Sequence, residues 1–344
     1  MTNVFYFKEI NSIGGVESFF YYLSKLYKNM VVYYKEGNPE QVKRLAHNIE
    51  VHKFNNKKIV CDRFFCSYGY DIGDYVEAKE YYHIIHCDYK ETRFSPLIYP
   101  GFKYIGVSKL VCDNFKNLTG IEAELIYNPI AIEKPKVEKK TDKIHLISAT
   151  RLSPEKGGDR IIKLAEMLDR AGIDYDWKVY SNRHLKKASP NIEKIDTKLD
   201  LTKEVAESTY LVQLSSHEAF GLSVAEALTL GTPVIVTDIP AFREIGCIHG
   251  KNAIICDLDM KNVDVDMIKK GLPKFTYKPP KSNWDKYLDN DTDYNPKELI
   301  EVRVKKKWFD IETGIHHAPH PTKTVRVRKE RASYLESLGI VEVL

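Results

Sequence analysis

A segment in the second half of the chain carries the pattern that most constrains the fold. The apolar run Tyr210–Leu214 predicts a buried strand, and Val234–Val236 predicts a second one. Between them a helical pattern begins at about Leu222 and ends at Gly231, and Pro233 prevents its continuation. Strand, loop, helix and strand in this order predict a βαβ unit of a parallel α/β sheet.

Two carboxylates lie in this unit. Glu218 is in the loop and Glu226 is about one turn into the helix, with seven residues between them. The loop follows the carboxyl end of a parallel strand, where open α/β sheets bind ligands, and the helix N-terminus favours anions. Both side chains are therefore expected to face a crevice. Two glutamates alone are equally compatible with a solvated pair that caps the helix.

The neighbouring residues change this balance. The stretch SSHEAFGLSVAEALTLGTPVI resembles the donor-site segment of retaining GT-B glycosyltransferases of family 4, in which two glutamates flank seven residues and a Gly-x-Pro-Val turn follows. The resemblance implies an α/β GT-B fold, with two Rossmann-like domains facing each other across a cleft. It implies that Glu218 binds hydroxyls of the donor sugar and that Glu226 holds the ribose. Backbone amides of Phe220, Gly221 and Leu222 are expected nearby.

A second motif follows the predicted strand Ile144–Ala149. An arginine and a lysine five residues apart in a loop are usually a solvated pair, but Arg151 to Gly157 matches the family pattern Arg-Leu-x-x-x-Lys-Gly. The resemblance implies that Arg151 and Lys156 grip the donor diphosphate. Arginine offers a planar fork and lysine a point charge, and both stabilise negative charge on a leaving group.

The N-terminal segment predicts a strand, a glycine loop and a helix. Val4–Phe7 is apolar, Gly14 and Gly15 follow, and apolar residues then recur at helical spacing. A Gly-Gly loop is either a plain turn or a place where backbone N–H groups approach a phosphate. In the family that this chain resembles, such a pair faces the donor diphosphate. The other helix face carries Tyr21, Tyr22, Lys25 and Lys28, which predicts an exposed face, with contact to a membrane surface as the alternative.

A histidine follows another predicted strand. His86 comes directly after Tyr81–Ile85. A lone histidine at such a place is most often structural. The resemblance implies instead that His86 contacts the transferred sugar, so it joins Glu218, Arg151 and Lys156 as a catalytic candidate.

The resemblance also predicts the domain organisation. An N-terminal Rossmann-like domain on the acceptor side is expected over residues 1–132, and a nucleotide-sugar-binding domain over 143–280. The lysine-, glutamate- and proline-rich stretch Glu133–Asp142 reads as the linker between them. Residues 281–294 are expected to form a crossover helix and a linker. One departure is Ser181-Asn182-Arg183, which stands where the family often has a Gly-x-Gly turn, so the nucleotide base stays open.

Residues 295–344 carry no donor motif and predict a small C-terminal α+β module. Strands are expected over 301–309, 325–327 and 341–343, and a helix over 330–338. Trp308, Phe309 and Leu338 would form a small core. The run VKKKWFDIETG loosely resembles modules of bacteriophage structural proteins. This resemblance predicts a homo-oligomer contact or docking to a protein or virion acceptor. His316, His317 and His320 favour a surface loop over a metal site.

Composition excludes several classes of protein. The formal charge is only +4, from 52 basic and 48 acidic residues among 344, which gives no strong nucleic-acid signal. No apolar run is long enough for a transmembrane helix, and the N-terminus does not resemble a signal peptide. Six scattered cysteines lack zinc spacing and predict reduced thiols. A cytoplasmic location follows as an expectation, which would be the host cytoplasm for a phage-encoded protein.

The resemblance thus implies a retaining, metal-independent glycosyltransferase. It would move a sugar from a nucleotide-diphosphate sugar, a UDP-sugar above all, to a hydroxyl of a glycan, cell-wall polymer or protein. No cofactor is expected beyond that substrate. The alternatives are a phage glycosyltransferase acting on DNA bases, a GT-B sugar-nucleotide epimerase, and a non-catalytic virion or carbohydrate-binding protein. The sequence names neither the sugar nor the acceptor.

Overall fold

A computed structural model describes residues 2–11, 13–92, 94–138, 142–185 and 189–288, and shorter stretches of the C-terminal part, namely 299–305, 308–310, 315–317, 324–328, 335–336 and 340–343. The chain divides into two compact units. One comprises Met1–Ser12, Leu23–Glu80 and Asp285–Leu344, and the other comprises Ile13–Tyr22 and Tyr81–Trp284. The domain boundaries expected from the sequence stay a prediction.

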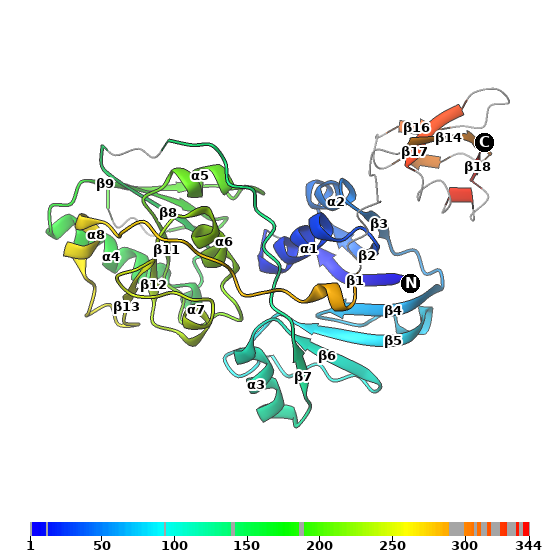
Figure 1. Ribbon diagram of the computed structural model, residues 1–344, viewed down its shortest axis with the longest axis horizontal. Coiled ribbons are helices and arrows are strands. Elements are labelled where there is room, and N and C mark those ends of the chain that lie inside the picture. The colour runs from blue at the N-terminus through cyan, green and yellow to red at the C-terminus, as the bar shows by residue number, and fades with distance from the viewer. Residues whose placement is uncertain are drawn as a thin grey trace. The chain divides into compact units, whose positions relative to one another are not determined.

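The N-terminal part of the chain builds a seven-stranded sheet. Its strands are β1 (Asn3–Ile10), β2 (Met30–Gly37), β3 (Glu50–Lys53), β4 (Ile59–Ser67), β5 (Val76–Ile85), β6 (Phe102–Gly106) and β7 (Ala123–Leu125), in the order β3-β2-β1-β4-β5-β6-β7 (Figure 1). The pairs β1–β2, β1–β4, β2–β3, β5–β6 and β6–β7 are parallel. The helices of this part are α1 (Gly15–Leu26), α2 (Pro39–Ala46) and α3 (Lys109–Thr119), with a 3-10 turn at Gly73–Tyr75.

The centre of this sheet is aromatic. Phe5 of β1 lies beside Val32 of β2 and Phe65 of β4, and the rings of Phe5 and Phe65 stack with their centroids 4.5 Å apart. Phe19 and Phe20 of α1 are fully buried. A central parallel strand is covered on both faces, so it reads as a continuous apolar run rather than an alternating one.

A six-stranded sheet follows. Its strands are β8 (Ile144–Ala149), β9 (Tyr175–Tyr180), β10 (Ile192–Ile195), β11 (Tyr210–Gln213), β12 (Val234–Thr237) and β13 (Ala253–Cys256), in the order β10-β9-β8-β11-β12-β13 with every neighbouring pair parallel (Figure 1). Its helices are α4 (Gly158–Arg170), α5 (Thr202–Glu207), α6 (Leu222–Leu230), α7 (Pro240–Glu244) and α8 (Val265–Lys270). The direction in which strands are added reverses between β8 and β11. That switch point is where sheets of this kind bind ligands.

The βαβ unit expected around Glu218 is confirmed as β11, α6 and β12. The strand expected at Ile144–Ala149 is also confirmed. The sequence analysis predicted no helix at α2, α3, α4, α5, α7 or α8 and no strand at β7 or β10.

The helix expected over the start of 281–294 is wrong for its described part. Residues 281–288 hold only a 3-10 turn, Trp284–Lys286, and residues 289–294 lie outside the described residues. The turn carries a buried aromatic side chain. Trp284 is fully buried, and its ring lies 5.6 Å from that of Phe19.

The C-terminal part contains two small antiparallel sheets. Strands β17 (Thr324–Arg328), β14 (Leu299–Val304) and β18 (Val341–Val343) form one in that order, and β15 (Trp308–Asp310) pairs with β16 (Ile315–His317) in the other. The single strand expected over 301–309 is therefore two strands. The helix expected over 330–338, the side chains of the expected core and those of the three histidines lie largely outside the described residues.

Two global features complete the fold. Among the described residues, none of the helices has the length and apolar character needed to cross a membrane. All six cysteines are free thiols, and five of them are buried.

One glycine constrains how β8 and β11 approach each other. Gly157, between the loop after β8 and helix α4, has φ +78°, and a Cβ there would lie 2.1 Å from the carbonyl oxygen of Leu214. We therefore expect Gly157→Ala to lower the free energy of unfolding by about 3 kcal/mol or more, because it adds a backbone clash to left-handed strain. Urea unfolding measures this loss.

The matched control is Gly172→Ala. Gly172 also has a positive φ, +63°, but a Cβ there meets nothing within 4 Å. Only the strain of about 1–2 kcal/mol should appear. Equal losses in the two variants would show that the approach to Leu214 is not a constraint.

Candidate functional site

Two loops meet at the switch point of the six-stranded sheet. The loop after β8 and the loop after β11 are joined because Lys156 Nζ lies 2.7 Å from Glu218 Oε1. Both side chains are largely buried, 18% and 15% exposed. The backbone joins the loops as well, since Ser216 N donates to the Glu155 carbonyl at 2.8 Å and Arg160 Nε donates to the Leu214 carbonyl at 2.6 Å. The structure thus brings together a cation and a carboxylate that lie 62 residues apart.

One oxygen of the Glu218 carboxylate is held from several sides. Oε1 accepts hydrogen bonds from Lys156 Nζ at 2.7 Å, from Ser215 Oγ at 2.7 Å and from Gln213 Nε2 at 3.4 Å. Gln213 Nε2 also donates to Ser215 Oγ at 2.7 Å. Within the described part of the chain, Oε2 has no partner. The carboxylate is therefore fixed through one oxygen, while the other can accept from a ligand.

Gln213 and Ser215 were missed in the sequence analysis. Gln213 is 4% exposed and Ser215 is fully buried. Gln213 Oε1 is buried and has no hydrogen-bond partner among the described residues. The available signal was a polar residue at the last position of an apolar strand, because a buried amide at a strand end usually serves a hydrogen-bond network.

Arg151 stands at the beginning of the same loop but is not joined to the pair. Its side chain is 64% exposed, and its Nη2 lies 3.6 Å from Glu155 Oε1. Glu155 Oε1 also accepts from Ser153 Oγ at 2.5 Å. An exposed ion pair of this kind contributes little to stability, so the guanidinium can turn toward a ligand at low cost.

Glu226 lies on α6 as expected, and its partner comes from α1. The hydroxyl of Tyr22 donates to Glu226 Oε1 at 2.8 Å. Tyr22 is only 6% exposed. The expectation that Tyr22 belongs to an exposed face of α1 is therefore wrong: its ring is buried and its hydroxyl bonds to a carboxylate.

The fold requires glycine at some positions of the predicted site and not at others. Gly221 has φ +91°, and a Cβ there would lie 2.8 Å from a ring atom of Phe242, so the turn into α6 needs glycine. Gly15 begins α1, and a Cβ there meets nothing within 4 Å. Gly14 accepts from Ser18 N at 3.0 Å through its carbonyl. The local fold gives no steric reason for glycine at position 15.

The loop that carries Glu218 is also anchored from α3. Ser108, the N-cap of α3, donates through Oγ to the Ala219 carbonyl at 2.6 Å. The next two amides donate to Glu244, Lys109 N to Oε1 at 2.5 Å and Leu110 N to Oε2 at 3.1 Å. The N-terminus of α3 is therefore occupied by a carboxylate of the chain itself. Phe220, in the anchored loop, is 3% exposed, and Leu222 begins α6.

His86 follows β5 with its Nε2 atom buried and its ring edge-on to Phe19 at a centroid distance of 4.7 Å. Desolvation, followed by the nearby His83, lowers the pKa of His86 to about 3. The ring is therefore neutral at pH 7. Burial raises the pKa of Asp88, and hydrogen bonds from Lys90 N and the Asn114 amide act in the opposite direction.

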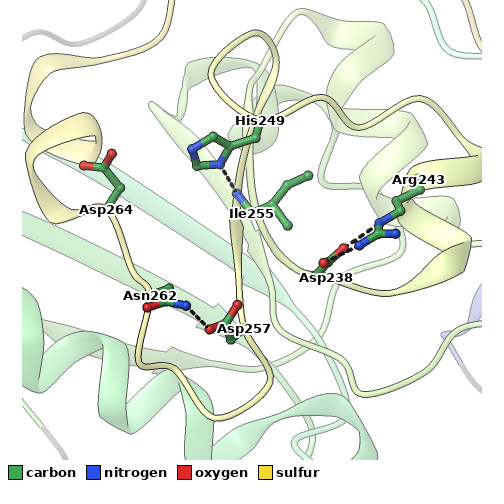
Figure 2. Close-up of a pocket in the computed structure, with 7 residues that line it drawn as sticks. All are labelled: Asp238, Arg243, His249, Ile255, Asp257, Asn262 and Asp264. Atoms are coloured by element: carbon green, nitrogen blue, oxygen red, sulfur yellow. Dashed lines mark hydrogen bonds and ion pairs between the residues drawn. The ribbon is translucent and has the colours of Figure 1, made fainter.

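A separate hollow lies beside β12 and β13 (Figure 2). Its charged and polar groups already serve one another or the backbone: Arg243 bonds to Asp238, Asn262 to Asp257, and His249 Nδ1 accepts from Ile255 N at 3.1 Å. None of the residues predicted from the sequence lines it. We place no candidate functional residue in this hollow.

The fold and this strand-end site define a two-domain α/β protein of the GT-B type, and solved structures share that fold. HepE from Anabaena, in complex with UDP and glucose, matches with a TM-score of 0.63 and 14% identity over 78% of this chain and 89% of that one. A glycosyltransferase from Rickettsia africae matches with a TM-score of 0.59 and 13% identity, over 78% and 87%. Sucrose-phosphate synthase from Thermosynechococcus elongatus matches at 0.53 and 9%, over 78% and 89%. At these identities the likeness establishes the fold.

Residues 130–283 match the family of glycosyl transferases group 1. This range contains Arg151, Lys156, Glu218 and Glu226. The match and the fold together support a group 1 glycosyltransferase. None of the curated proteins compared with this chain matches it.

The low pKa of His86 predicts a pH dependence of stability. Below about pH 6.5 the unfolded chain takes up a proton on this residue, whereas the folded chain does not until about pH 3. The unfolded state thus binds more protons in this window. The free energy of unfolding should fall with decreasing pH, by at most about 1.4 kcal/mol per pH unit from this group.

Urea unfolding of His86→Gln between pH 6.5 and 4 measures this contribution, and the variant should show a shallower slope than the unchanged protein. The control is His47→Gln, which changes an exposed histidine at the end of α2. A slope equal to that of the unchanged protein in His86→Gln would contradict the assignment.

Proposed function

We propose that the protein is a retaining glycosyltransferase that uses a nucleotide-diphosphate sugar, a UDP-sugar above all, and transfers the sugar to a hydroxyl group. The observation that carries the proposal is the contact between Lys156 and Glu218 at the switch point of the six-stranded sheet, 2.7 Å long. A cation for a diphosphate and an acceptor for sugar hydroxyls stand side by side there. The UDP and glucose bound by HepE support the choice of donor.

Each group has a role that its surroundings support. Lys156 and Arg151 bind the diphosphate and stabilise the charge that grows on it as it leaves. Glu218 accepts from hydroxyls of the donor sugar through Oε2, while Ser215 and Gln213 hold Oε1. Glu226 accepts from the ribose hydroxyls. Gly14 and Gly15 let backbone amides approach the phosphates, since the open space at Gly15 leaves room for a ligand.

The transfer follows from these roles. The acceptor oxygen attacks the anomeric carbon on the face from which the diphosphate departs, so the configuration is retained. The bond between that carbon and the phosphate oxygen breaks, and its electron pair goes to the diphosphate beside Lys156. The acceptor proton goes to the departing phosphate oxygen. His86, as a neutral ring, contributes a hydrogen bond to the sugar rather than a positive charge.

Substitution of the cations tests the roles of Arg151 and Lys156. We expect Lys156→Ala and Arg151→Ala each to reduce turnover by two or more powers of ten, on the order of 3 kcal/mol, because the growing charge loses its counterion. Release of nucleoside diphosphate from a panel of nucleotide sugars measures turnover. The controls are Lys203→Ala on α5 and Arg170→Ala on α4. They remove exposed cations, whose side chains are 72% and 75% accessible. Unchanged turnover in folded Lys156→Ala would sink the assignment.

We further propose that transfer needs no divalent metal and no other cofactor, because Lys156 and Arg151 supply positive charge where the diphosphate binds. Transfer is expected to continue in excess chelator at an unchanged rate. Assays with EDTA, followed by added manganese, check this. Activity that disappears with EDTA and returns with manganese would refute the proposal.

The acceptor is a hydroxyl of a glycan, a cell-wall polymer or a protein. We propose that the C-terminal segment from residue 295 onward brings a protein or virion acceptor to the enzyme or joins copies of the chain. Its two small antiparallel sheets, distinct in topology from the parallel sheets, support a separate role.

The six free thiols support a reducing compartment, the cytoplasm.

A further inference from the structure

The contact between Tyr22 and Glu226 joins two helices that lie far apart in the sequence. Tyr22 belongs to α1, seven residues after the glycine that begins the helix, and Glu226 belongs to α6. The hydroxyl of Tyr22 donates to Glu226 Oε1 at 2.8 Å across 204 residues of sequence. The carboxylate expected to bind the ribose is therefore held by a residue outside the segment that matches the family.

The surroundings of Tyr22 make this contact strong. The ring is 6% exposed, and a buried phenol requires a hydrogen-bond partner. A hydrogen bond to an ionised carboxylate is shorter and about twice as strong as one between neutral groups. Tyr22 thus has little freedom to release Glu226 to solvent.

Restraint of Glu226 matters because glutamate has a long, flexible side chain. An unrestrained glutamate loses rotamer freedom when it binds a ligand, which weakens binding. A carboxylate has about four lone-pair sites, so a hydrogen bond from Tyr22 does not prevent it from accepting from hydroxyls as well. The vicinal hydroxyls of a ribose are a pair of donors of suitable spacing for one carboxylate.

We propose that Tyr22 is a positioning residue for the donor: it fixes the carboxylate of Glu226 so that this group accepts from the ribose hydroxyls. The inference rests on the proposed function and adds a residue to it. It also makes α1 part of the nucleotide site through a side chain and not only through the glycines at its start. The site is incomplete without this helix.

The test compares ribose-containing and ribose-deficient ligands. Calorimetry measures the binding of UDP, ADP and GDP to the full chain, and then of the 2′,3′-dideoxy analogue of the tightest binder. Tyr22→Phe keeps the ring and removes only the hydroxyl. We expect it to weaken binding of the ribonucleotide by about three- to tenfold and to leave binding of the dideoxy analogue unchanged.

Two further variants separate positioning from a general effect. Tyr21→Phe removes a hydroxyl from the neighbouring residue of α1 and should change neither affinity. In a Glu226→Ala background, Tyr22→Phe should add no further loss, because the group that it positions is absent. In turnover assays the loss should appear in KM for the donor with kcat nearly unchanged, since the ribose is remote from the reacting bond.

The outcomes are distinguishable. If the unchanged protein binds none of the three nucleotides, the proposed function and this inference fail together. If it binds one of them and Tyr22→Phe binds equally well, the inference alone fails. Equal losses for the ribonucleotide and its dideoxy analogue would also overturn it, because the effect would not pass through the ribose.

Discussion

The ion pair between Lys156 and Glu218 is the interaction on which the strand-end site depends. Two largely buried charges are stable together only when further hydrogen bonds satisfy them, and Ser215 and Gln213 supply these. The carboxylate of Glu218 also balances the charge of Lys156. A diphosphate bound by Lys156 would replace Glu218 as the partner of its ammonium group. Lys156 would therefore have a negatively charged partner both before and after the diphosphate binds. Both loops are held in place for this exchange by the backbone contacts around Leu214.

Much of the six-stranded sheet could be predicted because most of its strands are short apolar runs. Tyr210–Gln213 and Val234–Thr237 are fully buried, so no alternation obscures them. The apolar pattern does not predict strands that are half-exposed. Ile192–Ile195 lies at the sheet edge and contains two charged residues, and it is a strand because it pairs with β9. The crossover helix was expected from resemblance, whereas burial of Trp284 fixes only a short turn there.

The candidate site was predicted from the family resemblance, because residue type and spacing alone were equally compatible with solvated pairs. Glu218 and Lys156 each stand after an apolar strand, and parallel strands bring their carboxyl ends to one edge. A contact between residues far apart in the sequence produces no local pattern from which it could be predicted. Tyr22 looked like part of a polar helix face, and nothing near it in the sequence names Glu226 as its partner. Gln213 was counted only as part of the predicted strand Tyr210–Leu214, because its role appears when the strand is placed beside the loop.

The carboxylate of Glu244 at the start of α3 determines where external anions can bind. A helix N-terminus attracts anions, but this one already holds a carboxylate that donates nothing and accepts from Lys109 N and Leu110 N. A tethered group acts at an effective concentration in the millimolar range or above, so a dissolved phosphate competes poorly with it. One of the polypeptide's own anions thus occupies this helix N-terminus. The protein in effect carries a built-in competitor that keeps dissolved phosphate away from the start of α3.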